Sequence, residues 1–343
     1  MNLTIFAAMQ TANLKHILII QTASIGDVIL VTPIIEKLHH FYPEAKIDLL
    51  IKKGYEDLFA GHPFLNFIWL WDKKTDKYKN LYHLIKAIRQ TKFDSVINVQ
   101  RFASTGFVTV FSGAKEKIGF NKNPLSLLYS KRIKHSIGKK NQTLHEIDRN
   151  LRLVQHLTDN TRQMPVLHPQ AADFARVSPY KTKAYICIAP ASLWFTKQFP
   201  ESQWIEFMRQ LPSDLHVYLL GSTADIPLCQ SVIDTSAHAN SINLAGKLSL
   251  LESAALMRDA MMNYVNDSAP MHLGSSINAK MTVIYCSTVP EFGFGPLSED
   301  ATIIETPEKL DCRPCGLHGY KECPKKHFKC STTIKTQQLL DRL

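Results

Sequence analysis

Asn263 to Ser276 reads NYVNDSAPMHLGSS, and this stretch decides the fold. We expect Val265 to end a buried strand, Asp267 and Ser268 to cap a helix, and Pro270 to lie in the first helical turn, where its missing N–H costs nothing. The order strand, cap, helix predicts the carboxyl edge of a parallel sheet. In open α/β sheets that edge is where ligands bind.

The same stretch suits an anionic ligand. N–H groups at a helix start can bind a phosphate, and the small residues Ser268 and Ala269 would let an anion reach the backbone. His272 lies one turn further along on the Ser268 face, where it offers another donor. An ordinary capped helix with a histidine in the core fits these residues equally well, because capping is what Asp and Ser most often do.

Size and composition indicate a soluble globular protein of two domains. The 343 residues are 45% apolar and 20% charged, and no run of about 18 uninterrupted apolar residues occurs. The segment Met1 to Asn13 is mildly apolar but lacks a basic leader, so we expect a ragged extension and no signal peptide. The net charge of +10 favours anionic partners, among which nucleic acid, acidic lipid and phosphorylated sugars all qualify.

The first half of the chain alternates predicted strands and helices. His16 to Ile20 predicts a strand, and Asp27 to His40 predicts the helix that follows it. The same alternation predicts strands at Ile47 to Ile51, Phe67 to Trp71 and Ser95 to Val99, and helices at Leu81 to Thr91 and His145 to Leu157. Such alternation is typical of a doubly wound α/β domain. Asp27 at the helix start is either a cap or, at the mouth of the first βα loop, a general base.

The segment Ser112 to Asn141 differs because it is strongly basic, and we expect a loop there. Its only acid is Glu116, against Lys115, Lys117, Lys122, Lys131, Arg132, Lys134, Lys139 and Lys140. A basic loop with an apolar centre suits an anionic lipid surface or a phosphorylated acceptor, and Lys122, Lys131 and Arg132 are the predicted acceptor-binding residues. A solvated surface loop is an equal alternative.

The second half repeats the pattern after a predicted linker, Asp159 to Tyr180, so we expect domains at 1–168 and 169–343. Strands are predicted at Tyr185 to Ala189, His216 to Leu220, Ser241 to Leu244 and Met281 to Tyr285, and helices at Glu201 to Leu211, Ile226 to Asp234 and Leu250 to Arg258. Two facing α/β domains predict a central ligand cleft. Neither GxGxxG nor GxxxxGK[ST] occurs, so a nucleotide must be held in another way.

Four pieces of the sequence carry a resemblance to a known family. They are SIGD at Ser24 to Asp27, the loop Ala191 to Phe199, AGKLSL at Ala245 to Leu250 and NDSAPMHL at Asn266 to Leu273. In this order the chain from Lys15 to Cys330 resembles glycosyltransferase family 9, the bacterial ADP-heptose lipopolysaccharide heptosyltransferases. The resemblance implies the GT-B fold, which consists of two Rossmann-like α/β domains facing a central cleft.

The resemblance also implies roles for individual residues. It makes 1–168 the acceptor-binding domain with Asp27 as catalytic base, and 169–343 the donor-binding domain with a Cys-rich tail. It assigns binding of the nucleotide-sugar donor to Ser192, Lys197, Lys247, Leu248, Asp267, Ser268, Ala269 and His272. One departure is that Ala269 replaces the usual Gly, which we expect to be tolerated if φ stays negative, since only the backbone N–H is needed there.

The implied function is inverting transfer of a heptose from ADP-heptose to a lipopolysaccharide inner-core acceptor of lipid A, Kdo and heptose. Asp27 would take the proton of the acceptor hydroxyl, and Lys197 would stabilise the leaving diphosphate, so catalysis needs no cofactor. We expect the enzyme in the cytoplasm, peripheral on the inner membrane, without a nucleic-acid partner. Within the same chemistry, the alternatives are transfer to a protein or another glycan, or from another nucleotide sugar.

A further alternative comes from a different class, a basic nucleic-acid-binding protein with a zinc-ribbon-like tail. Such a protein predicts a continuous basic face with stacking aromatic residues, whereas the charge here concentrates in one loop.

Four of the seven cysteines form C-x2-C-x7-C-x6-C near the end of the chain, at Cys312, Cys315, Cys323 and Cys330. The spacing is compatible with a structural zinc or iron site, two disulfides, or four free thiols. The resemblance favours metal, because some protein-directed heptosyltransferases bind iron through such a tail. His318 or His327 could replace a thiolate, and the other three cysteines are expected to be buried hydrophobes.

Overall fold

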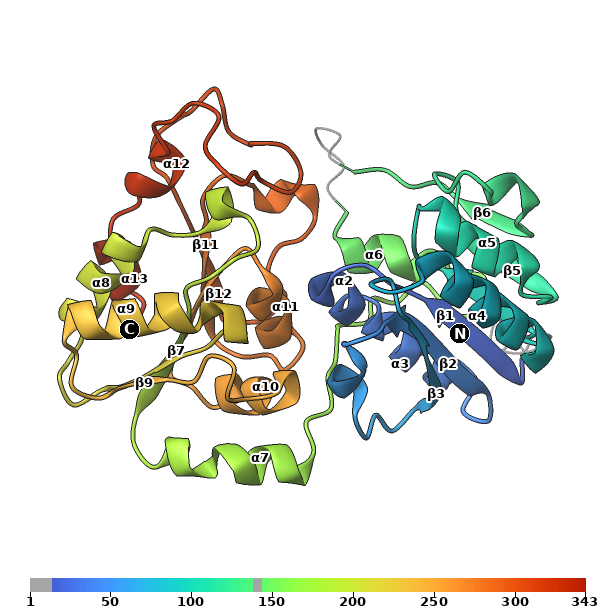
Figure 1. Cartoon of the computed structure of the whole chain (residues 1–343), viewed down its shortest axis with the longest axis horizontal. Coiled ribbons are helices and arrows are strands. Elements are labelled where there is room, and N and C mark those ends of the chain that lie inside the picture. Colours follow the sequence, from blue (N-terminus) through green and yellow to red (C-terminus); the bar gives the residue numbers. More distant parts are fainter. Residues whose placement is uncertain (1–13, 138–143) are drawn as a thin grey trace, which may run out of the picture. The chain divides into compact units, whose positions relative to one another are not determined.

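The computed structural model describes residues 14–137 and 144–343, and the chain divides into two compact units, Met1–His168 and Pro169–Leu343 (Figure 1). The predicted extension Met1 to Asn13 lies outside the described residues, as do Lys139 and Lys140 of the basic segment.

Unit 1 is built on a parallel sheet of six strands in the order β3-β2-β1-β4-β5-β6. The strands are β1 His16–Ile20, β2 Lys46–Lys52, β3 Leu65–Trp71, β4 Ser95–Asn98, β5 Glu116–Phe120 and β6 Lys131–Ile133. This is the Rossmann-type order, which reverses direction between β1 and β4. Residues 17–20 of the central strand β1 are completely buried, as expected for a parallel strand covered on both faces.

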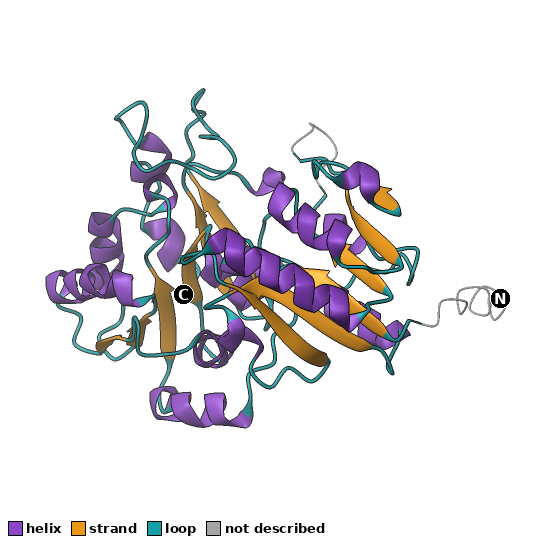
Figure 2. Cartoon of the chain, turned by 45° about the vertical axis from the view of Figure 1, so that its right-hand side comes forward, coloured by secondary structure: helices purple, strands orange, loops and turns teal. Residues whose placement is uncertain are grey.

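Helices cover both faces of this sheet (Figure 2). They are α2 Ile25–Ile29, α3 Thr32–Phe41, α4 Lys77–Thr91, α5 Ala103–Phe111 and α6 Glu146–Leu151, with short 3-10 turns η1 Glu56–Phe59 and η2 Ser126–Leu128. α4 packs with α5, and α3 packs with α6. Leu84 and Ile88 of α4 join Leu18, Ile20 and Val96 of the strands in one apolar core.

Unit 2 repeats the topology of unit 1. Its parallel sheet has the order β12-β11-β10-β7-β8-β9, with β7 Tyr185–Ala189, β8 His216–Leu219, β9 Ser241–Asn243, β10 Asn263–Asn266, β11 Met281–Tyr285 and β12 Ala301–Glu305. Counted from the first strand of the unit, this is again 3-2-1-4-5-6, and the direction reverses between β7 and β10. The aromatic residues Trp204, Phe207 and Tyr264 form the centre of its core.

The longer helices of unit 2 form two packed groups. They are α7 Ala171–Val177, α8 Glu201–Arg209, α9 Ile226–Ser236, α10 Leu250–Arg258 and α11 Ala269–Ser275, followed near the C-terminus by α12 Lys329–Thr332 and α13 Gln337–Leu340. The 3-10 turns are η3 Ser178–Lys181, η4 Phe195–Lys197, η5 Thr223–Asp225 and η6 Pro290–Phe292. α8 packs with α9 and α13, and α10 packs with α7 and α11.

The predicted doubly wound α/β architecture is confirmed, but the predicted single helix Asp27 to His40 is wrong. The structure has two helices there, because α2 ends at Ile29 and α3 begins at Thr32. Pro33 is the second residue of α3. A proline is tolerated in the first turn of a helix but disrupts a helix interior, so the new helix begins close to Pro33.

Two predictions of irregular structure are also wrong. The basic segment contains η2 and two strands, β5 and β6, because Ile118 and Phe120 are fully buried while the charged residues of β5 stay partly exposed. The predicted linker contains α7, whose first turn is fixed by Asp173 accepting a hydrogen bond from the N–H of Gln170 at 2.7 Å. The basic residues in the first segment and the prolines in the second favour a loop in the sequence analysis. The strands depend on tertiary burial and the helix on its cap, which that analysis did not include.

Candidate functional site

In unit 2 the candidate site lies at the switch between β7 and β10. Asn266, the last residue of β10, accepts a hydrogen bond from the Phe199 N–H at 2.9 Å and donates to the Pro190 carbonyl at 2.8 Å. This side chain is buried and holds both ends of the loop that follows β7. The loop carrying Lys197 is thereby fixed against the end of β10.

Lys197 and Asp267 form an ion pair at this edge of the sheet. The Lys197 Nζ lies 2.7 Å from Asp267 Oδ2, and the same oxygen accepts a hydrogen bond from the Thr288 hydroxyl at 2.5 Å. Asp267 is only 6% exposed. A lysine ammonium has three donors, so Lys197 retains donors for a further anion while Asp267 fixes its position.

The helix that starts after Asp267 is α11, with Ser268 as its N-cap residue and Pro270 as its second residue. The predicted helix start is therefore confirmed with Ser268 at the N-cap, but no side chain makes a cap hydrogen bond, and the predicted capping by Asp267 is wrong because Asp267 pairs with Lys197. Pro270 has no N–H and the Met271 N–H donates to the Ser268 carbonyl at 3.1 Å, which leaves the Ala269 N–H as the one suited to an acceptor in this first turn. Ala269 has no positive φ, so the alanine fits where the family has glycine, and His272 is buried on the helix.

The AGKLSL turn follows β9 at the same edge of the sheet. Gly246 has φ +69° and its N–H donates to the Gly221 carbonyl at 2.9 Å, so the glycine is required by a tight turn. Ser249 caps α10, accepting a hydrogen bond from the Glu252 N–H at 3.1 Å. Lys247 is exposed at this turn, next to the half-buried Leu248.

The remaining predicted donor residue, Ser192, belongs to the loop between β7 and Lys197. Its carbonyl accepts a hydrogen bond from Gln198 at 2.6 Å, and its side chain is partly exposed. The structure thus places every predicted donor residue at the carboxyl edge of the unit 2 sheet or on α11 directly behind it. Their binding roles remain predictions.

In unit 1, Asp27 follows β1 at the corresponding switch point. Its Oδ2 accepts hydrogen bonds from the Ser24 hydroxyl at 2.5 Å and the Ser24 N–H at 3.2 Å, which is a capping box for α2. Among the described residues, none donates a hydrogen bond to Oδ1. One oxygen of Asp27 therefore caps the helix, as one of the two predicted roles requires, and its role as a base remains a prediction.

A group of ionisable residues near Asp27 was missed by the sequence analysis. Arg149 donates to Glu146 at 2.6 Å, and burial raises the pKa of Glu146, with the charge of Asp27 adding to the rise and Arg149 opposing it. Burial and the nearby Arg101 and Arg149 lower the pKa of His135 to about 4. The only signal in the sequence was that Arg101 and His135 each come shortly after the end of a strand, which places them at the carboxyl edge of the sheet.

The predicted acceptor residues lie in two different places. Lys122 follows β5 at the carboxyl edge, and its charge acts on His135. Lys131 and Arg132 lie within β6, the outermost strand of the sheet, where they pair with Ile118 and Gly119 of β5. The structure therefore groups Lys122 with the Asp27 region and leaves Lys131 and Arg132 on the edge strand.

The four C-terminal cysteines line one cavity of about 240 Å³ together with His327 and Tyr320. All four cysteines are free thiols. Cys312 Sγ lies 3.7 Å from His327 Nε2. The other candidate histidine, His318, does not line the cavity. Burial and the neighbouring cysteines raise the pKa of Cys330 to about 12. The disulfide alternative is thus not what the structure shows.

The Cys-rich tail supports the Lys197 site, which the sequence did not reveal. The Tyr320 N–H donates to the Thr196 hydroxyl at 2.7 Å, and the Tyr320 carbonyl accepts from the Thr196 N–H at 3.1 Å. Arg313 donates to the Thr288 carbonyl at 2.8 Å. The tail therefore holds both the residue next to Lys197 and the threonine that binds Asp267.

Comparison with known proteins agrees with this architecture. The family model of glycosyltransferase family 9 (heptosyltransferase) matches residues 81–324. The chain is similar to lipopolysaccharide heptosyltransferase 3 of Escherichia coli K12, with 26% identity over 283 residues, 77% of this chain and 80% of that protein.

Two solved structures extend the similarity over nearly the whole chain, each at 20% identity. A family 9 glycosyl transferase from Veillonella parvula DSM 2008 gives a TM-score of 0.79 over 96% of this chain and 95% of its own. The ADP-heptose lipopolysaccharide heptosyltransferase II of Escherichia coli gives 0.76 over 95% and 97%. These similarities confirm the predicted GT-B fold class.

Proposed function

Because the chain belongs to glycosyltransferase family 9, the heptosyltransferase family, we propose that it transfers a heptose from ADP-heptose to the inner core of lipopolysaccharide. The chain is an enzyme of the glycosyltransferase class, as predicted. The observation that carries the finer proposal is the Lys197–Asp267 pair beside the start of α11. This arrangement supports binding of a diphosphate at the switch point of unit 2.

Unit 2 is the proposed donor domain. As the bond from the sugar C1 to the diphosphate breaks, negative charge builds on the departing ADP. Lys197 and the Ala269 N–H at the start of α11 stabilise that charge, and Asp267 keeps the ammonium of Lys197 in place. Ser192, Lys247, Leu248 and His272 complete the proposed donor site.

Unit 1 is the proposed acceptor domain. Asp27 Oδ1 accepts the proton of the attacking acceptor hydroxyl, and a single displacement at C1 inverts its configuration. Arg101 and Lys122 are exposed cations that suit the anionic groups of a lipopolysaccharide core. Lys131 and Arg132 extend this positive surface on β6.

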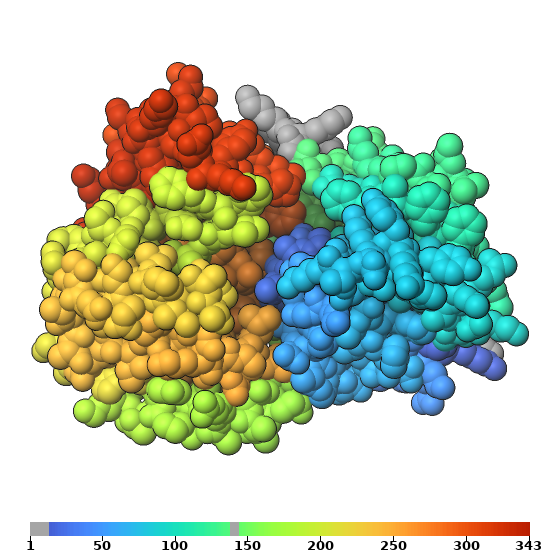
Figure 3. Space-filling model, viewed as in Figure 1, coloured from blue at the N-terminus to red at the C-terminus, as the bar shows by residue number. Residues whose placement is uncertain are grey.

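A patch of exposed apolar side chains on unit 1 supports peripheral membrane contact. It consists of Phe102, Phe107, Phe111, Leu127 and Leu128, of which Leu127 is 78% exposed. Asn123 donates to the Phe102 carbonyl at 3.0 Å, so the η2 segment lies against the start of α5. In Figure 3 the side chains of this part of unit 1, in turquoise and green, form part of the visible surface.

Such a patch beside Arg101 and Lys122 fits the interface of an anionic membrane, where apolar side chains insert and cations contact headgroups. Among the described residues, no helix has both the length and the apolar character needed to span a bilayer. We therefore propose that the enzyme works in the cytoplasm, at the surface of the inner membrane that presents its acceptor.

The C-terminal cysteines fit a structural metal. Four thiols and an imidazole around one cavity are a donor set that zinc or iron prefers. This cavity has no part in the proposed proton transfer. A metal held there would stabilise the tail that supports Lys197 and Thr288. Catalysis itself is proposed to need no cofactor.

Purified protein incubated with ADP-heptose and a lipid A–Kdo acceptor tests the proposed function. We expect release of ADP, a heptosylated product of inverted configuration by NMR, and thermal stabilisation by ADP-heptose but not by UDP- or GDP-sugars. Consumption of ADP-heptose only with a protein acceptor would replace the proposed acceptor by a protein. If ADP-heptose neither stabilises the enzyme nor is consumed with any acceptor, the proposed donor is wrong.

A further inference from the structure

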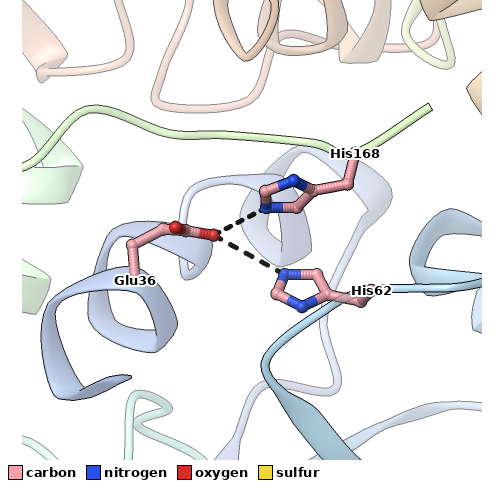
Figure 4. Close-up of side chains that lie close together, drawn as sticks. All are labelled: Glu36, His62 and His168. Carbon is pink, nitrogen blue, oxygen red and sulfur yellow. Dashed lines mark hydrogen bonds and ion pairs between the residues drawn. The ribbon is translucent and has the colours of Figure 1, made fainter. Parts of the chain in front are cut away.

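Three potential metal ligands meet in unit 1, outside the site described above (Figure 4). They are Glu36 of α3, His62 in the loop before β3, and His168, the last residue of the unit. Glu36 Oε1 lies 2.9 Å from His168 Nε2 and 3.7 Å from His62 Nε2, and the three ligand atoms all lie within 4.8 Å of one another. No other group of three His, Cys, Asp or Glu among the described residues meets that criterion.

The cluster consists of one buried and two partly buried side chains, and it is short of positive charge. His62 is 8% exposed, and no donor or acceptor hydrogen-bonds to its Nε2, which points toward Glu36 at a distance too long for a hydrogen bond. Glu36 has no lysine or arginine as an ion-pair partner in the described part of the chain. A carboxylate in such surroundings needs a compensating cation.

His62 does not easily supply that charge. Burial, followed by His168 and His39, lowers the pKa of His62 to about 3, so this ring is neutral at physiological pH. A neutral imidazole is the form that binds metal. Two imidazoles and one carboxylate are a frequent ligand set for zinc and related divalent ions, with a further position left for water.

We propose that Glu36, His62 and His168 bind one divalent transition-metal ion of the zinc type. The ion links three segments that are far apart in the sequence, among them the residue at which the chain leaves unit 1. The ion fixes this exit point against α3, and its further position remains open to water. The proposal is independent of the sugar donor and acceptor.

Coordination requires one rearrangement in His62. The Phe64 N–H donates to His62 Nδ1 at 3.2 Å, so the neutral ring carries its proton on Nε2. Binding through Nε2 moves this proton to Nδ1 and gives up that hydrogen bond. The amide of Phe64 therefore reports on the site, because its NMR signal must shift when the ion binds.

The test must separate this site from the C-terminal cysteines. We would use full-length protein carrying Cys315→Ser and Cys323→Ser, strip it with a chelator, and titrate it with Co²⁺ and Zn²⁺. We expect one ion per chain by elemental analysis, Co²⁺ bands in the visible range without thiolate charge transfer, and a shift of the Phe64 amide. Adding His168→Gln should weaken binding by at least about 100-fold, because loss of even an outer partner of a ligand costs 10–100-fold.

The matched control is His40→Gln, the same change at an exposed histidine of α3 that is not part of the cluster. It should bind metal like the parent protein. Since His168 is a partly exposed residue at the edge of unit 1, its variant is expected to fold, which circular dichroism would verify. Equal metal content and affinity in the His168→Gln and His40→Gln proteins, or no metal in the parent, would overturn the proposal and leave a His–Glu–His hydrogen-bond cluster.

Discussion

The two units share one sheet topology and one position for their polar residues, yet their switch points have opposite chemistry. At β1, unit 1 presents a carboxylate, Asp27, with one oxygen capping a helix and the other without a donor among the described residues. At β7 and β10, unit 2 presents a cation, Lys197, held by Asp267. The proposed function uses the first as a proton acceptor and the second as the group that receives the leaving anion.

The lysines of the two halves differ in the same way. In unit 1, Lys73 binds the loop before Asp27 by donating to the Thr22 carbonyl at 2.6 Å and hydroxyl at 2.8 Å, and no carboxylate of the described residues pairs with it. In unit 2, Lys197 has a carboxylate partner, Asp267. An opposite charge nearby favours the charged form of a side chain, whereas burial without such a partner disfavours it.

Removing the carboxylate of unit 1 should have the largest effect. Asp27→Asn keeps the size of the side chain but cannot accept a proton, so we expect kcat to fall by about 10²–10⁴-fold while the affinity for ADP-heptose stays within twofold. Turnover by ADP release and binding by calorimetry measure the two quantities. Asp173→Asn removes a similar capping carboxylate from α7 and should leave turnover unchanged. Normal turnover by Asp27→Asn would show that Asp27 only caps α2.

Removing the cation of unit 2 should act on binding. Lys197→Ala is expected to weaken ADP binding by about 10- to 100-fold, because this factor corresponds to the free energy that a hydrogen bond to a charged group usually contributes. The variant also leaves Asp267 buried without its partner, so its thermal stability should fall. Lys197→Arg keeps both charges and should retain most of the affinity, and Lys183→Ala is a control at an exposed lysine of the same unit. Unchanged ADP affinity in Lys197→Ala would place the diphosphate elsewhere.

The apolar patch on unit 1 is the basis of the proposed membrane contact, which unit 2 is not expected to share. Leu127→Ser with Leu128→Ser should reduce binding to vesicles containing phosphatidylglycerol by about tenfold, because two leucines no longer enter the interface. Co-sedimentation with the vesicles measures the effect. Leu193→Ser, at an 88% exposed leucine of unit 2, is the matched control and should bind normally. Equal losses in both proteins would contradict the assignment of the surface to unit 1.

The sequence predicts the shared architecture of the two halves better than their difference. Strands such as Ile17 to Ile20 and Tyr185 to Ala189 are apolar on both faces, so the predicted bounds agree with the structure. The strands β5 and β6 were missed because β5 begins with the partly exposed Glu116 and Lys117, and no residue of β6 is buried.

The site residues show the limit more clearly. Ser24 with Asp27 and Ser222 with Asp225 form the same capping box, so local sequence does not distinguish a base from a cap. The charge of Asp27 acts on Glu146 of α6, more than 100 residues away, and Asp267 meets Lys197 across 70 residues. Such contacts depend on the order of strands in the sheet, which a single sequence does not state.

The smallest expected effect concerns Lys73 and the pH dependence of unit 1. Burial and the charges of Lys52 and Lys77 lower its pKa to about 8 from the usual 10.5. Between these two pH values the unfolded chain holds this proton and the folded chain does not, so the free energy of unfolding rises with pH in that window.

The full shift corresponds to about 3 kcal/mol, and solvent screening at a half-exposed side chain reduces the expected effect to about 1 kcal/mol. The free energy of unfolding, measured with urea, should therefore rise between pH 7.5 and pH 10 by about 1 kcal/mol more in the wild type than in Lys73→Met, which lacks the titrating group. Lys74→Met, at the exposed neighbour, should keep the pH dependence of the wild type. Parallel curves for wild type and Lys73→Met would mean that Lys73 keeps its proton in the folded protein up to pH 10 and that its burial does not affect stability in this window.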